Sequence, residues 1–174
     1  MKTFSTRSTA ETEALAERLA RSVRPGEVWC LRGDLGVGKT AFARGFARGL
    51  AVSREVTSPT FTLVHEYACV FGDGTKGRFC HFDIYRLGSE DELYEIGWDE
   101  YSADGSVCLV EWADQLRGAM PADAVWVTIE KELAEGTEFR WITVEQPDRG
   151  GEDMNLDAGN ADRNAEIAGE EERA

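Results

Sequence analysis

The stretch GDLGVGKT, residues 33–40, decides how this chain folds, because it fits the pattern G-x-x-x-x-G-K-[ST]. The apolar run EVWCL at residues 27–31 precedes it and indicates a buried strand. The segment AFARGFARGL at residues 41–50 follows it and is typical of a helix. A strand, a glycine-rich turn and a helix in this order form a unit that binds the phosphates of a nucleotide.

The residue types in this stretch suit a phosphate group. Glycines at 36 and 38 let consecutive backbone N–H groups face inward, and a helix starting near Lys39 adds the positive end of its dipole. We expect Lys39 to reach the β and γ phosphates and Thr40 to ligate magnesium. The cradle itself is predicted from Gly33, Asp34, Leu35, Gly36, Val37 and Gly38. The alternative is a glycine-rich loop between a strand and a helix that holds no ligand.

Two acids compete for the second position in a magnesium shell, which is commonly an acid after four apolar residues of a buried strand. Residues 107–110, VCLV, followed by Glu111 fit this pattern fully, whereas FCHF before Asp83 is interrupted by His81. We assign Glu111 to the magnesium shell, partly through water, and Asp83 to positioning the attacking water. The alternative for either acid is a strand end that faces solvent.

Three other features leave their roles open. TSPTF at residues 57–61, with Thr60, follows the lysine by about twenty residues, where a loop that senses the γ phosphate or an ordinary polar loop both fit. Trp112 fits either the core or a nucleotide contact. His65 and His81 lie on β-like segments without ligand spacing and are interpreted as ordinary half-buried side chains.

The pattern of apolar residues and turn signals predicts an α/β domain with a mixed parallel and antiparallel sheet covered by helices. Capping boxes at Ser8 and Ser89 mark two helix starts. The expected elements are helices at 9–23, at 39–50 and after Ser89, strands at 27–32 and 106–112, and hairpins formed by 61–71 with 77–87 and by 124–132 with 138–146.

Charge divides the chain in two. The formal net charge is −14, and residues 147–174 hold nine acids and three bases with no aromatic residue. We predict a single domain at residues 1–146 and a disordered acidic tail at 147–174. The acidic body argues against strong unaided binding to nucleic acid. Without a long apolar run or a Cys-x-x-Cys pair, we expect a cytoplasmic protein with no membrane contact and buried, reduced cysteines.

Four motifs in order, GDLGVGKT, SPTF running on to TLVHEY, HFDIYRL and LVEW, closely resemble the bacterial tRNA threonylcarbamoyladenosine biosynthesis ATPase family, TsaE. The resemblance runs from about residue 8 to 146. It implies a three-layer P-loop NTPase-like fold and an ATPase that supports N6-threonylcarbamoyladenosine (t6A) formation at adenosine 37 of tRNA. It also implies ATP and Mg²⁺ as cofactors. The implied partners are the transferase subunit TsaD and its companion TsaB, with tRNA held mainly by that complex, which ATP hydrolysis supports or resets.

Carried over by motif, the resemblance implies that Lys39 and the loop amides bind phosphate, and that Thr40 and Glu111 ligate magnesium. It places Thr60 in the switch-like loop, makes Asp83 necessary for hydrolysis, and puts the segment from Ser8 to Thr12 near adenine. Members of the family often carry a Gly-Arg pair in the C-terminal hairpin, whereas this chain has Gly136-Thr137.

Two other classes of function use the same loop. A small-molecule kinase would use Asp83 to deprotonate a substrate hydroxyl, although no arginine-rich lid segment is evident. A nucleotide-gated binding module would turn over little and act by changing its affinity for a partner.

Overall fold

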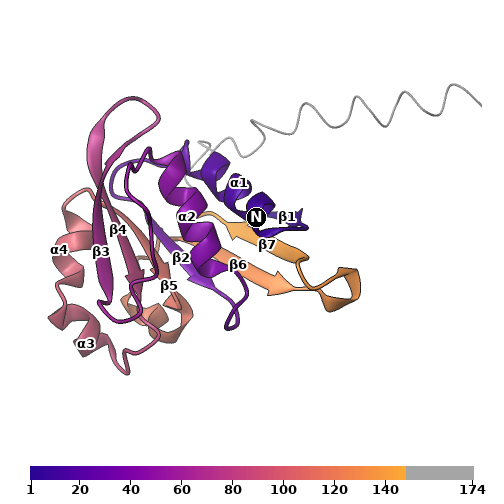
Figure 1. Ribbon diagram of the computed structural model, residues 1–174. Helices are drawn as coiled ribbons and strands as arrows, with labels where there is room; N and C mark the ends of the chain where they lie inside the picture. Colours follow the sequence, from indigo (N-terminus) through magenta and orange to yellow (C-terminus); the bar gives the residue numbers. More distant parts are fainter. Residues whose placement is uncertain (148–174) are drawn as a thin grey trace, which may run out of the picture.

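The glycine-rich turn lies at the carboxyl edge of a sheet that runs through the whole domain (Figure 1). The computed structural model describes residues 1–147. Within this range the sheet has seven strands, in the order β1-β7-β6-β2-β5-β4-β3. The strands are β1 (Lys2–Thr6), β2 (Val28–Arg32), β3 (Val64–Val70), β4 (Lys76–Asp83), β5 (Val107–Glu111), β6 (Val125–Lys131) and β7 (Arg140–Glu145). The helices are α1 (Thr9–Ala20), α2 (Lys39–Gly49), α3 (Glu90–Glu95), α4 (Trp98–Ala103) and the short 3-10 segments η1 (Ala113–Ala119) and η2 (Leu133–Glu135).

The centre of the sheet is parallel and its margins are antiparallel. Strand β2 pairs in parallel with β5 and β6, and β4 pairs in parallel with β5. Strands β3, β7 and β1 add antiparallel pairs. The central strands are apolar on both faces, as parallel strands covered on both sides must be. The predicted mixed α/β sheet is therefore confirmed.

Helices cover the sheet on two faces. Side chains alternate along each strand, so neighbouring residues enter different cores. One core packs Trp29 and Phe79 against α1 and α2, which lie side by side in Figure 1. The other packs Cys30 and Phe82 against residues of α3, α4 and η1, including Trp98. This arrangement confirms the three-layer P-loop-like fold.

Helix α1 is shorter than predicted. It begins as expected, with the Ser8 hydroxyl accepting from the Glu11 N–H at 3.1 Å. It ends at Ala20 rather than at residue 23, because the following N–H groups turn back to carbonyls three residues earlier. Pro25 lies beyond this turn and cannot continue a helix.

Both hairpins are confirmed, with strands shorter than predicted. The β3–β4 hairpin turns at Asp73-Gly74, where Gly74 has a φ of 86°. The β6–β7 hairpin turns through η2. Strand β1 and helix α4 were not predicted. Strand β1 pairs with β7, which lies about 140 residues away in the sequence, and a local sequence pattern does not predict such a pairing.

The four cysteines are free thiols and all are buried, as predicted. Among residues 1–147, no helix combines the length and apolar character that crossing a membrane requires. The predicted acidic tail, apart from Pro147, lies outside the described residues.

Candidate functional site

Glycines shape the loop between β2 and α2. Gly33, Gly36 and Gly38 all have positive φ angles, of 141°, 69° and 115°. A Cβ at Gly33 would lie 2.3 Å from the carbonyl oxygen of Ile129, so a side chain has no room there. Gly38 is the N-cap of α2, and it brings the helix N-terminus to the loop. The glycines and the helix N-terminus therefore permit the turn that an anion cradle requires.

The non-glycine residues of the loop have different environments. Leu35 is 78% exposed at the tip of the loop, whereas Val37 is buried. The Val37 carbonyl accepts a hydrogen bond from Arg140 Nε at 2.7 Å, which ties the loop to the start of β7. The Asp34 carbonyl faces the loop interior, where it accepts a hydrogen bond from Lys39 Nζ. Phosphate binding by these residues stays a prediction.

Lys39 lies inside the loop with its charge held by the backbone. Its Nζ donates to the carbonyl oxygens of Gly33 at 2.6 Å and Asp34 at 2.9 Å. The same ammonium lies 3.5 Å from the ring centroid of Trp112. Burial lowers the pKa of Lys39, and nearby carboxylates, of which Glu111 acts most strongly, oppose that shift. A partly desolvated cation of this kind gains strongly from an anionic ligand.

Glu111 joins the loop helix to the sheet. Its Oε2 accepts from the hydroxyl of Thr40, the second residue of α2, at 3.2 Å. Its Oε1 lies 2.9 Å from Nε2 of His81 on the neighbouring strand β4. Glu111 and His81 are both buried. The structure therefore brings together the two residues that the sequence assigned to a magnesium shell.

Asp83 holds the loop at residues 57–61. Its Oδ2 accepts from the hydroxyls of Thr60 at 2.7 Å and Ser58 at 3.2 Å. Its Oδ1 accepts from the backbone N–H of Tyr85 at 3.1 Å. A displacement of this loop would therefore break hydrogen bonds to a buried carboxylate.

The two acids that competed in the sequence lie side by side. Asp83 and Glu111 end the parallel strands β4 and β5 and are register partners. Both are nearly buried, at 4% and 3% exposure. Their shared edge is where parallel α/β sheets bind ligands, beyond the carboxyl ends of the strands.

Thr12 belongs to the first turn of α1 and faces the interior rather than the surface. It is buried, and its hydroxyl shares a hydrogen bond of 2.8 Å with the hydroxyl of Thr6. It also donates to the Ser8 carbonyl at 3.2 Å. Thr12 therefore fixes the start of α1 against β1, and a contact with nucleotide stays a prediction.

The start of α1 adjoins the loop between β6 and β7. Thr9 donates to Glu138 at 3.3 Å, and the Arg7 guanidinium lies 5.1 Å from the Phe139 ring centroid. Arg140, which holds the glycine-rich loop, follows directly in the same segment. The N-terminal segment, the C-terminal hairpin and the glycine-rich loop thus meet around one edge of the sheet.

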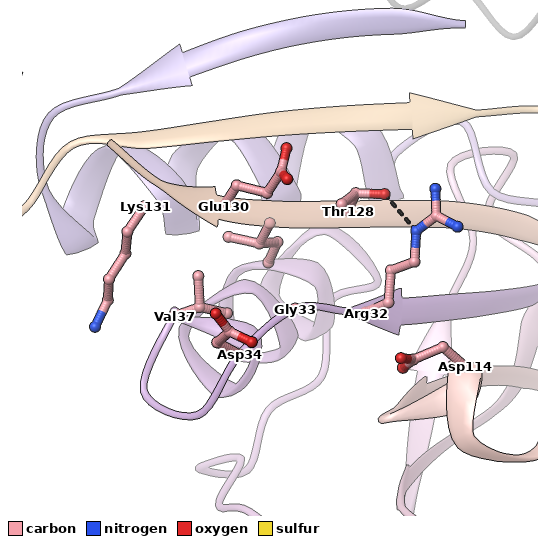
Figure 2. Close-up of a pocket in the computed structure, with 9 residues that line it drawn as sticks. Arg32, Gly33, Asp34, Val37, Asp114, Thr128, Glu130 and Lys131 are labelled. Atoms are coloured by element: carbon pink, nitrogen blue, oxygen red, sulfur yellow. Dashed lines mark hydrogen bonds between the residues drawn. The ribbon is translucent and has the colours of Figure 1, made fainter. Parts of the chain in front are cut away.

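A cavity of about 310 Å³ opens beside the first half of the glycine-rich loop (Figure 2). In Figure 2 Lys131 extends from the end of β6 beside the loop, and its Nζ lies 3.9 Å from where a Cβ of Gly36 would be. Carboxylates of Asp34 and Asp114 flank the cavity from the loop and from η1. The cavity is lined by Arg32, Gly33, Asp34, Val37, Asp114, Thr128, Ile129, Glu130 and Lys131.

One interpretation from the sequence is wrong. His81 is fully buried rather than half-buried, and it contacts Glu111 directly. His65 is half-buried as predicted, with its ring nitrogens near the hydroxyls of Thr62 and Tyr67. His81 lies two residues before Asp83 on one strand, so both side chains are on the same face of the sheet. This spacing was the feature of the sequence that could have predicted His81 near the candidate site.

Trp112 takes part in both environments left open by the sequence. It packs against the core beneath α3 and α4, and its ring lies under the Lys39 ammonium. It also contacts the ring of Tyr85, with centroids 4.8 Å apart. Trp112 has a φ of 66°, which is rare for a large side chain and commonly found at functional sites.

The donors around Thr40 fit magnesium. Among the described residues, no three His, Cys, Asp or Glu side chains cluster as a metal site. Magnesium, however, is commonly held by one or two protein oxygens together with water and the phosphates of a nucleotide. The hydroxyl of Thr40 and a carboxylate oxygen of Glu111, 3.2 Å apart at the helix N-terminus, are donors of the required type.

A glycine-rich loop between a strand and a helix, its lysine and threonine, and acids at the ends of two adjacent parallel strands are the features of the P-loop class of α/β proteins. Comparison with known proteins narrows the class. A family model described as "Threonylcarbamoyl adenosine biosynthesis protein TsaE" matches residues 6–139. The chain belongs to the TsaE family.

Curated relatives named tRNA threonylcarbamoyladenosine biosynthesis protein TsaE match most of the chain. The relative from Bacillus subtilis (strain 168) is 43% identical over 133 residues, covering 76% of this chain and 78% of its own. The relative from Treponema pallidum is 36% identical over 140 residues, covering 79% and 96%. The crystal structure of Bacillus subtilis YdiB superposes with a TM-score of 0.66 at 35% identity, covering 83% of this chain and 84% of that one.

Proposed function

We propose that this protein is a magnesium-dependent ATPase that supports t6A formation at adenosine 37 of tRNA. The observation that carries the proposal is the contact between Thr40 at the loop helix and Glu111 at the end of β5, beside the buried Lys39. Membership of a family named for threonylcarbamoyladenosine biosynthesis supports the pathway.

Lys39 binds the β and γ phosphates of ATP in this proposal. It exchanges the neutral carbonyl oxygens of Gly33 and Asp34 for anionic phosphate oxygens, which attract the ammonium more strongly. The loop from Gly33 to Gly38 offers backbone N–H groups to the same phosphates. Thr40 and Glu111 would hold Mg²⁺, which when bound neutralises charge on the phosphate oxygens.

Asp83 positions the attacking water, and the loop at residues 57–61 responds to the γ phosphate. Because Thr60 and Ser58 both donate to Asp83, a change in the loop alters the hydrogen bonds of the carboxylate. This link couples the state of the nucleotide to the shape of a surface loop. The exposed Phe61 on this loop would carry the change to the surface.

Adenine lies, in this proposal, beside the start of α1. The segment from Ser8 to Thr12 borders the β6–β7 loop through the contact of Thr9 with Glu138. Arg140 fixes the glycine-rich loop against the same segment and is the nearest counterpart of the arginine that relatives often carry in this hairpin. Direct contact of Arg140 with nucleotide is not part of the proposal, because its guanidinium already serves three backbone carbonyls.

Partners complete the function. We place the transferase subunit TsaD and its companion TsaB as the complex that this ATPase supports or resets, in the cytoplasm, where tRNA is located. The net charge of −14 favours a protein that reaches tRNA through that complex rather than alone.

ATP hydrolysis by the purified chain, alone and with TsaD and TsaB, tests the proposal. Threonylcarbamoyladenosine in tRNA is followed over several rounds in the same samples. We expect hydrolysis to depend on the partners, and multi-round modification to be lost with Glu111→Ala. If the partners change nothing and no multi-round effect appears, the proposed function is wrong.

Product analysis separates the two alternatives. Orthophosphate release without a phosphorylated acceptor supports the ATPase, whereas stoichiometric phosphorylation of a metabolite would identify a kinase. An Asp83→Asn variant that hydrolyses no ATP yet still supports tRNA modification would identify a nucleotide-gated binding module.

A further inference from the structure

His81 is a polar side chain in the interior of the sheet, close to the proposed site but absent from the proposed reaction. It has no exposed surface and lies on β4 between the register partners His65 on β3 and Leu109 on β5. Its ring stacks on that of Phe79, with an interplanar angle of 10°. Burial of an imidazole at this depth is costly unless its polar atoms are used.

The two ring nitrogens of His81 differ in their surroundings. Nε2 lies 2.9 Å from Oε1 of Glu111, and since a carboxylate only accepts, Nε2 carries the hydrogen. Nδ1 is buried and has no hydrogen-bond partner among the described residues. Because a buried N–H without an acceptor is rarely tolerated, the geometry selects the tautomer in which Nδ1 is bare.

The hydrogen bond from His81 occupies one oxygen of Glu111 and leaves the other for Thr40 on α2. Oε1 is held from within the sheet, so Oε2 is the oxygen that faces the Thr40 hydroxyl. The terminal torsion of a glutamate is otherwise broad. The geometry points to His81 as a positioning residue that fixes the carboxylate plane of Glu111 toward Thr40. This inference rests on the proposed function, in which Glu111 and Thr40 hold magnesium.

Two variants separate the hydrogen bond from the shape of the ring. His81→Phe keeps an aromatic ring on Phe79 and removes the donor. His81→Gln keeps an amide N–H near the position of Nε2 and removes the ring. His65→Phe, on the neighbouring strand, is the matched control, because His65 contacts Thr62 and Tyr67 rather than Glu111.

ATP affinity is measured by calorimetry over a range of magnesium concentrations at one fixed pH. Loss of an outer partner of a metal ligand commonly lowers metal affinity about 10- to 100-fold, so His81→Phe should raise the magnesium requirement by that factor. ATP affinity without magnesium should stay unchanged. We expect His81→Gln to recover most of the loss and His65→Phe to match the wild type.

The tautomer supplies a readout that needs neither nucleotide nor metal. The chain holds two histidines, so ¹⁵N-histidine labelling gives two ring systems, and His65→Phe assigns them. A hydrogen on Nε2 of His81 supports the inference, and a bare Nε2 overturns it. This measurement on the wild type stands even where a His81 variant fails to fold.

The outcomes for the inference and for the proposed function are distinct. If wild-type ATP binding does not depend on magnesium, the proposed function fails. If it does depend on magnesium and His81→Phe has the wild-type requirement, only the role of His81 is overturned. A raised magnesium requirement in His81→Gln together with a wild-type requirement in His81→Phe would assign His81 to packing alone and would also overturn the inference.

Discussion

At the scale of single residues, the candidate site consists of charges that the fold buries and then partly compensates. Among residues 1–147, the close partners of Lys39 are backbone carbonyls and the face of Trp112, while Glu111 and Asp83 accept hydrogen bonds from hydroxyl, imidazole and backbone donors. Such groups are desolvated before any ligand arrives, and so the interactions with a ligand are stronger than they would be in water.

Lys39→Ala should abolish ATP binding and leave the fold intact. The lysine donates to two loop carbonyls, which water can serve in its place, and its removal relieves the desolvation that lowers its pKa. We expect the free energy of unfolding without ligand to change by less than about 1 kcal/mol. Calorimetry for ATP and a thermal unfolding curve provide the two measurements.

Lys76→Ala is the control for charge, because Lys76 is exposed at the far end of β4. It should retain ATP binding. A large fall in the melting temperature of the ligand-free Lys39→Ala variant would contradict the role assigned to the lysine.

At the scale of elements, the contact of α1 with α2 holds the loop helix in place. A Cβ at Gly45 would lie 2.0 Å from the Glu13 carbonyl oxygen, and one at Gly49 would lie 2.3 Å from that of Glu17. These glycines, four residues apart on one face of α2, let the helix backbones approach closely. Because α2 begins at Lys39, the separation of the helices also sets the position of the loop.

Gly45→Ala should destabilise the protein although alanine is the better helix former. Overpacking against a backbone carbonyl costs about 1–3 kcal/mol, which exceeds the gain of about 1 kcal/mol in helix propensity. Urea unfolding measures the difference.

The control for Gly45→Ala is Ala14→Gly on the exposed side of α1, which should cost about 1 kcal/mol through propensity alone. The exchange of glycine for alanine at residue 45 and of alanine for glycine at residue 14 are thus both expected to destabilise the protein. Stabilisation by Gly45→Ala would mean that propensity, not close approach, governs this contact.

Ion pairs across the same contact should make stability depend on pH. Glu13 accepts from Arg44 and Arg48. Burial acts to raise the pKa of Glu13, but the two arginines outweigh it and the pKa lies below its ordinary value of 4.5. The pairing therefore stabilises the fold above pH 4.5, and the stabilisation is lost as the pH falls through the lower pKa of the folded state.

Glu13→Gln should cost about 0.5–1 kcal/mol at pH 7 and progressively less below pH 4.5. Urea unfolding at a series of pH values measures this, with Glu55→Gln as the control at an exposed site. A cost for Glu13→Gln that is independent of pH would show that the side chain contributes through packing instead.

At the scale of the whole molecule, the site exists because four strands end at one edge. Strands β2, β4, β5 and β6 are arranged with their carboxyl ends together. They deliver the glycine-rich loop, Asp83, Glu111 and Lys131 to that edge. The cores on the two faces of the sheet hold these strand ends in register. The packing of the whole domain therefore keeps the residues of the candidate site in place.

Deletion of residues 147–174 should leave the domain as stable as the full chain. Both cores and all the strands of the described sheet lie within residues 1–146. We expect the melting temperature to change by less than about 2 °C, equivalent to less than about 1 kcal/mol for a domain of this size. A fall of several times that value would place part of the folded unit in the deleted residues.

Local patterns predicted much of this architecture. The glycine-rich stretch, the capping box at Ser8 and the hairpin formed by 61–71 with 77–87 act through neighbouring residues, and each was found where expected. The apolar run ending at Glu111 predicted both a buried strand and the acid at its end. Local structure that depends on backbone freedom and on hydrogen bonds within one short segment could therefore be predicted from the sequence.

Contacts between residues that are far apart in the sequence could not be predicted in this way. Strand β1 depends on a partner about 140 residues away, and the contact of Gly45 with Glu13 depends on how two helices pack. His81 looked like an interruption of an apolar run, and its hydrogen bond to Glu111 follows from the register of β4 with β5.

The sequence by itself determined the glycine-rich loop between a strand and a helix, the class of fold and the acids at the ends of two strands, because these depend on residue type and local spacing. Only the tertiary structure decided that Asp83 and Glu111 share one edge, that His81 holds Glu111, and that Lys39 lies over Trp112. The physical reason is that strand register and burial arise from packing the whole sheet, and no single segment carries that information.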